Sequence, residues 1–269
     1  MKIVVCIKQV PSASQVNIDE ETGVLLRESA GAKLNPYDLF ALEAAFRLRE
    51  RHGGEVTTIS MGPPQTKTAI REAFYMGADR GFLLSDIKFA GADVLATAYT
   101  ISQGIRLLGD FDLIICGKQT TDGDTAQVGP AIAEYLGIPH VAWVEDMEVN
   151  GVDKECGEAG GVTVRQDLPD ACETVFMRFP CLVTVERGAL IPRLPSYKRM
   201  KAMRGREAEV LAFDSFPDRD ESKYGLSGSP TKVVRMFPPQ QMEMHEVWTG
   251  DGRVLANRMS DKLRQMKFL

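Results

Sequence analysis

Short apolar runs alternate with helix-length segments over the first 150 residues of the chain. The runs have the length of buried strands and lie at residues 3–10, 56–61, 80–84, 111–116 and 138–149. Helical periodicity separates them, most clearly at Val94, Ala98, Ile101, Ile105 and Leu108, spaced four, three, four and three residues apart. Strands joined through helices favour right-handed crossovers and parallel pairing. The alternation therefore predicts an α/β fold on a doubly wound, mostly parallel Rossmann-like sheet with helices on both faces.

The pattern changes after Val149. A glycine-rich, charged segment (150–161) leads into residues 162–185, whose alternation and content of threonine and valine predict a flanking β-hairpin. From Arg187 onward proline, glycine and mixed charge dominate, and apolar positions are too sparse for a separate core. We therefore predict an α/β domain over residues 1–186 and an extended C-terminal arm over 187–269. Such an arm packs either on this domain or on another subunit.

Charge and cysteine usage argue against several classes of function. The formal net charge is −5, so the chain has no general attraction for nucleic acid or for an anionic membrane. No stretch reaches the roughly 20 apolar residues of a membrane span, which argues against membrane insertion. The five cysteines are scattered and form no CxxC pair, which fits a protein of the reducing cytoplasm. The three histidines show no metal-ligand spacing, and we expect no metal site.

The segment GKQTTDGDTAQVGP (117–130) lies where a predicted strand becomes a predicted helix. In doubly wound sheets this junction commonly receives the phosphates of a nucleotide, which bind to backbone N–H groups and hydroxyls such as those of the threonines here. Asp122 and Asp124 repel phosphate, so we expect one of them to cap the helix and the other to accept hydrogen bonds from ribose hydroxyls. The alternative is a well-capped helix without a ligand, and the pattern alone does not separate the two.

Two other segments should meet this loop at the carboxyl edge of the sheet. Residues 6–9 (CIKQ) end the first strand. Residues 35–38 (NPYD) begin the first helix, with Asn35 as its N-cap and Pro36 in its first position. Lys8 either neutralises a phosphate or forms an ion pair with a carboxylate, since an unpaired charge there would be costly.

The chain contains, in this order, the segments CIKQV, NPYDLFALEAAFRLRE, MGADRG, GKQTTDGDTAQVGP, ETVFMRFPCLVTV and KRMKAMRG. Their order and approximate spacing resemble those of the beta subunits of electron-transfer flavoproteins. The similarity covers nearly the whole chain, and the combination is specific although no single segment is. The resemblance implies an adenine-nucleotide site in the domain 1–186 and a partner-contacting role for the arm 187–269.

The resemblance also implies which residues contact the nucleotide, although it identifies no catalytic residue. Carried over by position, and with Lys8 added for its place beside them, the cofactor-binding residues are Cys6, Lys8, Asn35, Pro36, Tyr37, Asp38, Met61, Gly117, Lys118, Gln119, Thr120, Thr121, Asp122, Gly123, Asp124, Thr125, Ala126, Gln127 and Val128.

The family has two branches that hold different nucleotides at this position. In the ordinary branch the ligand is AMP, whereas in the bifurcating branch it is FAD, which accepts a hydride from NADH and sends two electrons along different paths. The loop TTDGDTAQVGP resembles the bifurcating version, which favours FAD, with AMP as the alternative. An adenine-nucleotide sensor module on a similar sheet is a further alternative, which the long arm disfavours.

The resemblance implies protein partners as well. They are an alpha subunit that carries another FAD, a flavin-dependent dehydrogenase, for example of the acyl-CoA type, and ferredoxin or flavodoxin as a low-potential acceptor. The basic run 193–206 resembles the family's partner-docking segment, in which an apolar side chain enters the dehydrogenase. Here Leu194 is the candidate, with Lys198, Arg199 and Lys201 beside it. A solvated helix face is the alternative for these charges.

Overall fold

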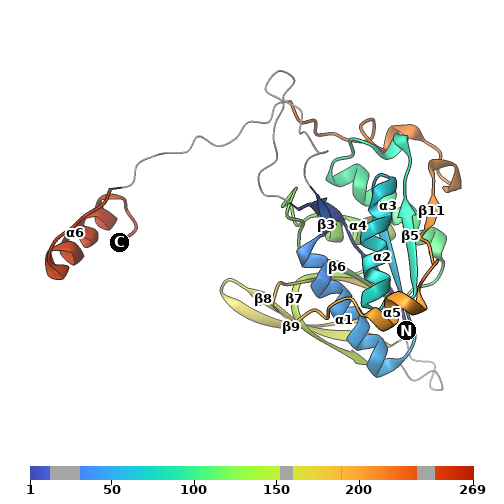
Figure 1. Ribbon diagram of the computed structural model, residues 1–269, viewed down its shortest axis with the longest axis horizontal. Coiled ribbons are helices and arrows are strands. Elements are labelled where there is room, and N and C mark those ends of the chain that lie inside the picture. The colour runs from blue at the N-terminus through green and yellow to red at the C-terminus, as the bar shows by residue number, and fades with distance from the viewer. Residues whose placement is uncertain (13–30, 152–159, 189, 235–245) are drawn as a thin grey trace. The chain divides into compact units, whose positions relative to one another are not determined.

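The computed structural model describes residues 1–12, 31–151, 160–188, 190–234 and 246–269. It divides into two compact units, Met1–Val234 and Arg235–Leu269, each of which is described by itself (Figure 1). Within the ranges just given, every helix is too short or too polar to span a bilayer.

A nine-stranded sheet forms the centre of the first unit, counted over its described residues. Its strands are β1 (Lys2–Cys6), β4 (Glu55–Met61), β5 (Arg80–Leu84), β6 (Leu113–Gly117), β7 (His140–Asn150), β8 (Gly161–Leu168), β9 (Ala171–Arg178), β10 (Cys181–Val185) and β11 (Glu209–Leu211). They lie in the order β11-β5-β4-β1-β6-β10-β7-β8-β9. Pairing is parallel from β11 to β7 and antiparallel from β7 to β9.

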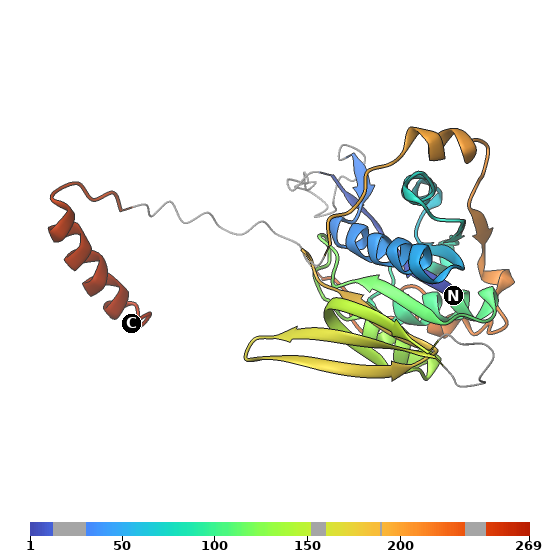
Figure 2. The same ribbon diagram turned by 90° about the horizontal axis from the view of Figure 1, so that it is seen from below.

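Helices cover both faces of this sheet. They are α1 (Pro36–His52), α2 (Lys67–Met76), α3 (Val94–Leu108) and α4 (Val128–Leu136). Alternate residues of β1 point to opposite faces: Ile3 and Val5 share a core with α1 and α2, and Val4 and Cys6 share the other core with α3 and α4 (Figure 2). The predicted doubly wound, mostly parallel α/β fold is confirmed.

Local sequence sets the helix boundaries. The Asp93 carboxylate accepts a hydrogen bond of 3.1 Å from the backbone N–H of Ala96 and caps α3, which ends at Gly109 with φ +83°. Helix α1 begins with Pro36, as predicted, and Asn35 occupies the N-cap position. The Asn35 side chain makes no capping hydrogen bond, because its donors and acceptor are used elsewhere.

The first predicted strand, 3–10, is divided into two. Strand β1 ends at Cys6, and β2 (Gln9–Pro11) leaves the sheet to pair with β3 (Ala32–Leu34) in a separate antiparallel ribbon. The break falls at Lys8, whose backbone N–H donates to the Asp38 carboxylate at 2.7 Å and whose carbonyl accepts from the N–H of Asn35 at 2.9 Å. These contacts with the start of α1 replace the ladder that would have continued the strand.

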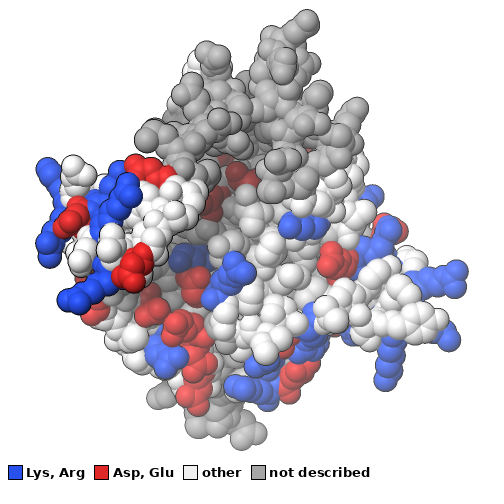
Figure 3. Space-filling view, turned by 60° about the vertical axis from the view of Figure 1, so that its left-hand side comes forward, with Lys and Arg blue, Asp and Glu red and all other residues white. Residues whose placement is uncertain are grey.

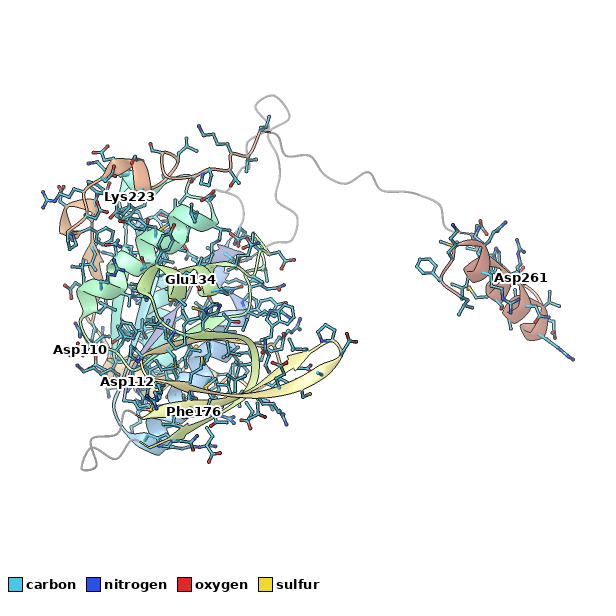
Figure 4. The ribbon with its side chains drawn as sticks, turned by 180° about the vertical axis from the view of Figure 1, so that it is seen from behind. Asp110, Asp112, Glu134, Phe176, Lys223 and Asp261 are labelled. Atoms are coloured by element: carbon cyan, nitrogen blue, oxygen red, sulfur yellow. The ribbon has the colours of Figure 1, made fainter. Side chains whose placement is uncertain are left out.

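The predicted hairpin 162–185 contains three strands. Strands β8 and β9 form an antiparallel hairpin that extends from the sheet, with Phe176 exposed on its outer strand (Figures 2 and 4). The last five residues instead form β10, which lies in parallel between β6 and β7 and is buried throughout. An unbroken apolar run of this kind suits a strand covered on both faces rather than a hairpin with one solvent-facing side. The hairpin therefore covers only Gly161–Arg178.

The segment after Arg187 does not separate from the domain at that residue. Strand β11 extends the sheet beyond β5, and the first compact unit continues to Val234. Phe213, Phe216 and Tyr224 pack their rings with Phe89, and Lys223 lies nearby in sequence on a short 3-10 turn (Figure 4). The region 187–234 thus packs on its own domain, which was one of the two alternatives for the arm. Its contact with a partner stays a prediction.

The second unit contains the helix α6 (Gly252–Gln265). The Asp251 carboxylate caps it by accepting a 2.9 Å hydrogen bond from the N–H of Arg253. Lys262 forms an ion pair of 2.8 Å with Glu246, and Arg258 lies 4.4 Å from the centre of the Trp248 ring. No residue of α6 is buried, and none of residues 246–269, the part of this unit that the structure describes, belongs to a core.

Candidate nucleotide site

Strands β1 and β6 lie side by side, but the chain leaves them in opposite directions along the sheet. It passes from β1 to β4 on one side, and from β6 through α4 to β7 on the other. Cys6 and Cys116 are opposite each other near the carboxyl ends of the two strands. Such a reversal of strand order opens a crevice at the carboxyl edge, where open α/β sheets bind their ligands. The predicted segments 6–9, 35–38 and 117–128 all reach this edge.

Asn35 connects two of these segments. Its side-chain N–H₂ donates a hydrogen bond of 2.9 Å to the Asp38 carboxylate and another of 2.9 Å to the carbonyl of Gln119. Its side-chain oxygen accepts one of 3.3 Å from the N–H of Thr121. Asn35 is fully buried, so these three bonds satisfy its amide and fix the first half of the loop against α1.

Asp38 is a buried carboxyl beneath the loop. It accepts hydrogen bonds from the N–H groups of Lys8 and Gly117 and from the Asn35 amide. Burial nevertheless dominates and raises the pKa of Asp38 to about 7. A β-carbon at Gly117 would lie 2.5 Å from the Asp38 carboxylate oxygen, so only glycine allows the end of β6 to approach α1 this closely.

Lys8 forms an ion pair with Asp122, with Nζ 2.8 Å from Oδ2 and 3.1 Å from Oδ1. Burial disfavours the charge of Asp122, but the hydrogen bond and the charge of Lys8 outweigh it and lower the pKa of Asp122. Of the two alternatives for Lys8, the structure shows the ion pair with a carboxylate. Because this pair neutralises Asp122, the carboxylate repels a phosphate in the crevice less than an isolated charge would.

The two aspartates of the loop do not cap α4. Asp122 accepts from its neighbour Gly123 at 2.8 Å and pairs with Lys8, and Asp124 accepts from the Gln119 side-chain amide. The N-cap residue Gln127 makes no side-chain capping bond. The prediction that an aspartate caps this helix is therefore wrong, since both carboxylates are engaged within the site.

The start of α4 has donors to offer an anion. The N–H groups of Val128 and Gly129 have no carbonyl partner within the helix, and Pro130 has no N–H. Gly129 packs tightly, since a β-carbon there would lie 2.6 Å from Thr184. Thr121 and Thr125 are exposed, and Thr120 is half-buried. These residues fit the phosphates and ribose of a nucleotide: two backbone donors, hydroxyls and a loop braced from below.

Other predicted residues lie at the same edge without joining the hydrogen-bond network. Met61 ends β4, two residues beyond the partner of Cys6 in β1. Cys6 is buried beside Cys116, and its side chain, with burial, raises the pKa of the Cys116 thiol, so that thiol carries no charge near pH 7. The backbone at this edge includes Pro36, the first residue of α1, and Gln127, the N-cap residue of α4, which follows Ala126. Ala126 adopts φ +55° and Asp124 φ +51°, two left-handed residues within three positions.

Comparison with known proteins decides the family. The model of the electron transfer flavoprotein domain matches residues 22–215. The chain belongs to the electron transfer flavoprotein family. It is 42% identical over 264 residues to the electron transfer flavoprotein subunit beta of Thermoanaerobacterium thermosaccharolyticum, covering 98% of each chain. It is 40% identical over 269 residues to the same subunit of Clostridium acetobutylicum, covering both chains completely. It is 38% identical to the caffeyl-CoA reductase-Etf complex subunit CarD of Acetobacterium woodii, over 98% of each chain.

Lys118 makes contacts that the sequence did not indicate. Its ammonium lies 2.5 Å from the Glu186 carboxylate and 4.7 Å from the centre of the Trp143 ring. Glu186 directly follows β10, at the carboxyl end of a central strand. Recognising residues 181–185 as a buried parallel strand would have placed Glu186 at the site edge.

The segment 190–203 is fixed to the rest of the first unit at three points. Arg193 forms ion pairs with Glu43 at 2.8 Å and with Glu50 at 2.5 Å, both on α1. The N–H of Ser196 donates to the Tyr75 carbonyl at 2.9 Å. Arg199, in the short helix α5 (Tyr197–Ala202), donates to the carbonyls of Gly77 and Ala78 at 2.6 and 2.9 Å.

Several residues between and beside these points face solvent. Leu194 is 84% exposed, and Ile191 and Tyr197 are 86% and 76% exposed. Lys198 and Lys201 are exposed as well, whereas the guanidinium of Arg199 turns inward to the end of α2. The structure thus brings Leu194, Lys198 and Lys201 to the surface and separates Arg199 from them. Sequence reasoning did not find the partners Glu43 and Glu50, because no local pattern relates them to Arg193.

Proposed function

We propose that this chain is the nucleotide-binding beta subunit of a bifurcating electron transfer flavoprotein, with FAD at the loop 117–128 and NADH as hydride donor. One observation carries the proposal: Asn35 and Asp38 join the end of β1, the start of α1 and the loop in one hydrogen-bonded network at the point where strand order reverses. The ending of the loop, with Val128, Gly129 and Pro130 in the first turn of α4, supports FAD rather than AMP through its resemblance to the bifurcating branch.

The chain's own residues bind and orient the nucleotide. The N–H groups of Val128 and Gly129, together with the hydroxyls of Thr121 and Thr125, hold phosphate. Asp124 accepts from ribose hydroxyls, and Gln119 holds its carboxylate in place. Lys8 keeps the Asp122 charge compensated. When bound, the flavin would supply an acceptor for a hydride, which carries two electrons.

The electrons leave the site through protein partners. These are an alpha subunit with a second FAD, a flavin-dependent dehydrogenase for which Leu194 is the anchor, and ferredoxin or flavodoxin for the low-potential electron. The name of the Acetobacterium woodii relative describes a complex with caffeyl-CoA reductase, which supports a dehydrogenase of the acyl-CoA type. We place this assembly in the cytoplasm.

Cofactor analysis of the purified alpha–beta complex tests the proposal. We expect two FAD per heterodimer, and NADH should reduce the flavin anaerobically. One FAD and one AMP per heterodimer would instead establish the ordinary, non-bifurcating branch. The match to beta subunits over 98–100% of their length disfavours the sensor alternative.

The variant Asp124→Asn links the loop to this result. It keeps the size of the side chain but weakens its acceptor capacity, so FAD should be lost from one site per heterodimer on desalting. Glu173→Gln, an exposed substitution on β9, serves as the control and should retain both flavins. If Asp124→Asn retained both FAD molecules, the loop would not be part of the cofactor site.

A further inference from the structure

A cleft of about 450 Å³ lies between α2, α5 and the residues that follow α5. Helix α5 lies next to α2 in both ribbon views (Figures 1 and 2). The cleft is far along the chain from the nucleotide loop, and none of the residues carried over for the nucleotide lines it.

The charge of the cleft is opposite to that of the whole chain. Four cationic side chains and one carboxylate line it: Arg71, Lys201, Arg204, Arg206 and Glu207. The chain as a whole has a formal net charge of −5, and positive and negative side chains are interspersed on the face seen in Figure 3. A local excess of three positive charges, four minus one, therefore distinguishes this cleft.

One carboxylate already occupies part of this cationic set. Glu207 lies 3.1 Å from Arg71, with side chains 57% and 45% exposed. Such an exposed pair is weak and exchanges readily for another carboxylate. Among the residues that the structure describes, Lys201, Arg204 and Arg206 have no ion-pair partner.

Apolar side chains line the rest of the cleft and continue the surface around Leu194. Tyr75, Tyr197 and Met200 line it. Tyr197 is 76% exposed and stands three residues after Leu194, which is itself 84% exposed. Rings and a thioether beside several cations suit a peptide with acidic and apolar side chains better than they suit a bare phosphate.

We propose that this cleft binds a carboxylate-bearing segment of the partner protein that docks at Leu194. The inference rests on the proposed function, because it extends the proposed docking surface from an apolar anchor to a neighbouring charged site. The apolar anchor supplies burial, and the cleft selects partners that place aspartate or glutamate beside their pocket for Leu194.

A peptide probe tests the cleft without the natural partner. Fluorescence anisotropy measures binding of a labelled peptide of alternating aspartate and glutamate with one central phenylalanine to the intact alpha–beta complex at low salt. The double variant Arg204→Gln with Arg206→Gln should weaken binding by roughly tenfold, and Glu207→Gln should strengthen it by roughly threefold. Arg51→Gln, the loss of an exposed cation near the end of α1 outside both the cleft and the docking segment, should change affinity by less than about twofold.

Weaker peptide binding by Arg204→Gln with Arg206→Gln and tighter binding by Glu207→Gln would identify the cleft as the binding site. Equal weakening by Arg51→Gln would show a diffuse surface effect and overturn the proposal. Equal binding of the peptide with asparagine and glutamine in place of its acids would also overturn it. So would competition by inorganic pyrophosphate that abolishes binding at concentrations equal to those of the peptide, since that identifies a small-anion site.

The result of the peptide-binding experiment does not depend on which nucleotide the complex holds. Flavin content and the circular dichroism spectrum of each variant should equal those of the parent complex, because the cleft shares no residue with the nucleotide site. A complex that holds AMP but shows the expected peptide selectivity would contradict the bifurcating function and keep the cleft. A complex with two FAD and no peptide selectivity would support the bifurcating function and contradict the cleft proposal.

Discussion

The side-chain amide of Asn35 donates a 2.9 Å hydrogen bond to the main-chain carbonyl of Gln119, which is 84 residues away in sequence. Replacing Asn35 with alanine removes three hydrogen bonds from a buried position and leaves the Gln119 carbonyl and the Thr121 N–H without this partner. We expect a loss of about 1–3 kcal/mol in the free energy of unfolding and faster release of the nucleotide. Urea unfolding and flavin release during dialysis measure the two effects.

Asn150→Ala is the control for that substitution. It removes an exposed asparagine amide that donates a 2.7 Å hydrogen bond to the Thr163 hydroxyl, on strands β7 and β8 outside the site. Its effect on both measurements should be small. Equal nucleotide retention in the parent and in Asn35→Ala would show that the loop needs no support from α1.

The Asp38 carboxyl should make stability depend on pH. Its pKa is raised by burial from 3.8 to about 7, so the folded state holds a proton that the unfolded state has released between these values. Stability therefore falls as pH rises from about 4 to about 7, and the full penalty applies above that range. Asp38→Asn cannot ionise, so its unfolding free energy should not show this decline. Parallel curves for the parent and the variant would refute the assignment.

Gly117 should not tolerate a side chain. In Gly117→Ala the new methyl group would lie 2.5 Å from the Asp38 carboxylate oxygen and 2.8 Å from the Tyr37 carbonyl carbon. Overpacking of this kind costs about 1–3 kcal/mol, which thermal unfolding measures. Gly123→Ala is the matched control in the same loop, because its methyl group would meet only Thr120 at 3.7 Å. Similar midpoints for the two variants would contradict the close approach.

Leu194→Ala should slow electron delivery to the dehydrogenase at every ionic strength, because burial of one leucine stabilises a docked complex by roughly 1.5–3 kcal/mol. The double variant Lys198→Gln with Lys201→Gln should act mainly at low salt, where screening is weak. Arg199 is left unchanged, because it fixes α5 to α2. Ile87→Ala, an 86% exposed apolar residue outside this segment, controls for loss of surface area. NADH oxidation with an artificial acceptor should survive all of these changes, and an equal loss there would show that Leu194 is not the anchor.

Arg193 should position Leu194. Burial opposes ionisation of Glu43, but hydrogen bonds from Arg193 and Arg47 outweigh it and lower the pKa of Glu43. This contribution to stability is present above the ordinary value of 4.5 and is lost as pH falls through the lowered pKa. Arg193→Met should cost about 1–3 kcal/mol at neutral pH and less at a pH below the lowered pKa of Glu43, and it should impair docking although Leu194 is intact. Normal docking in this variant would show that the ion pairs of Arg193 with Glu43 and Glu50 do not position Leu194.

Periodic elements could be predicted from the sequence, whereas features that depend on distant partners could not. Strand β5 was predicted with its observed bounds, and the helical face from Val94 to Leu108 is α3. The end of β1 was missed, because the group that takes the Lys8 N–H from the sheet is a carboxylate 30 residues away. Strand β10 was assigned to the hairpin, because a short apolar run after a hairpin pattern does not reveal which strands will accept it.

The candidate site shows the same division. The edge where segments 6–9, 35–38 and 117–128 meet follows from the general geometry of doubly wound sheets. The pairing of Lys8 with Asp122 was one of two alternatives, and only the folded chain selects it. The helix cap assigned to an aspartate failed because both carboxylates found side-chain or backbone partners inside the site. Glu186 and the Arg193 clamp depend on contacts across 68 and 150 residues, which no local pattern encodes.

Strand β10 lies between β6 and β7 although it is made after both of them. On the ribosome, a nascent chain that ends before Cys181 contains two parts of the sheet, β5-β4-β1-β6 and β7-β8-β9, but lacks the strand that joins them. In the part made of β7, β8 and β9, the edge of β7 that later pairs with β10 is then unpaired. Unpaired strand edges are places where chains mispair or recruit a chaperone. The edge that carries the loop 117–128 cannot take its final form until this late strand arrives, since the Lys118 N–H bonds to the carbonyl of Val185 and Glu186 follows directly. Completion of this edge is therefore timed by the last central strand to be synthesised.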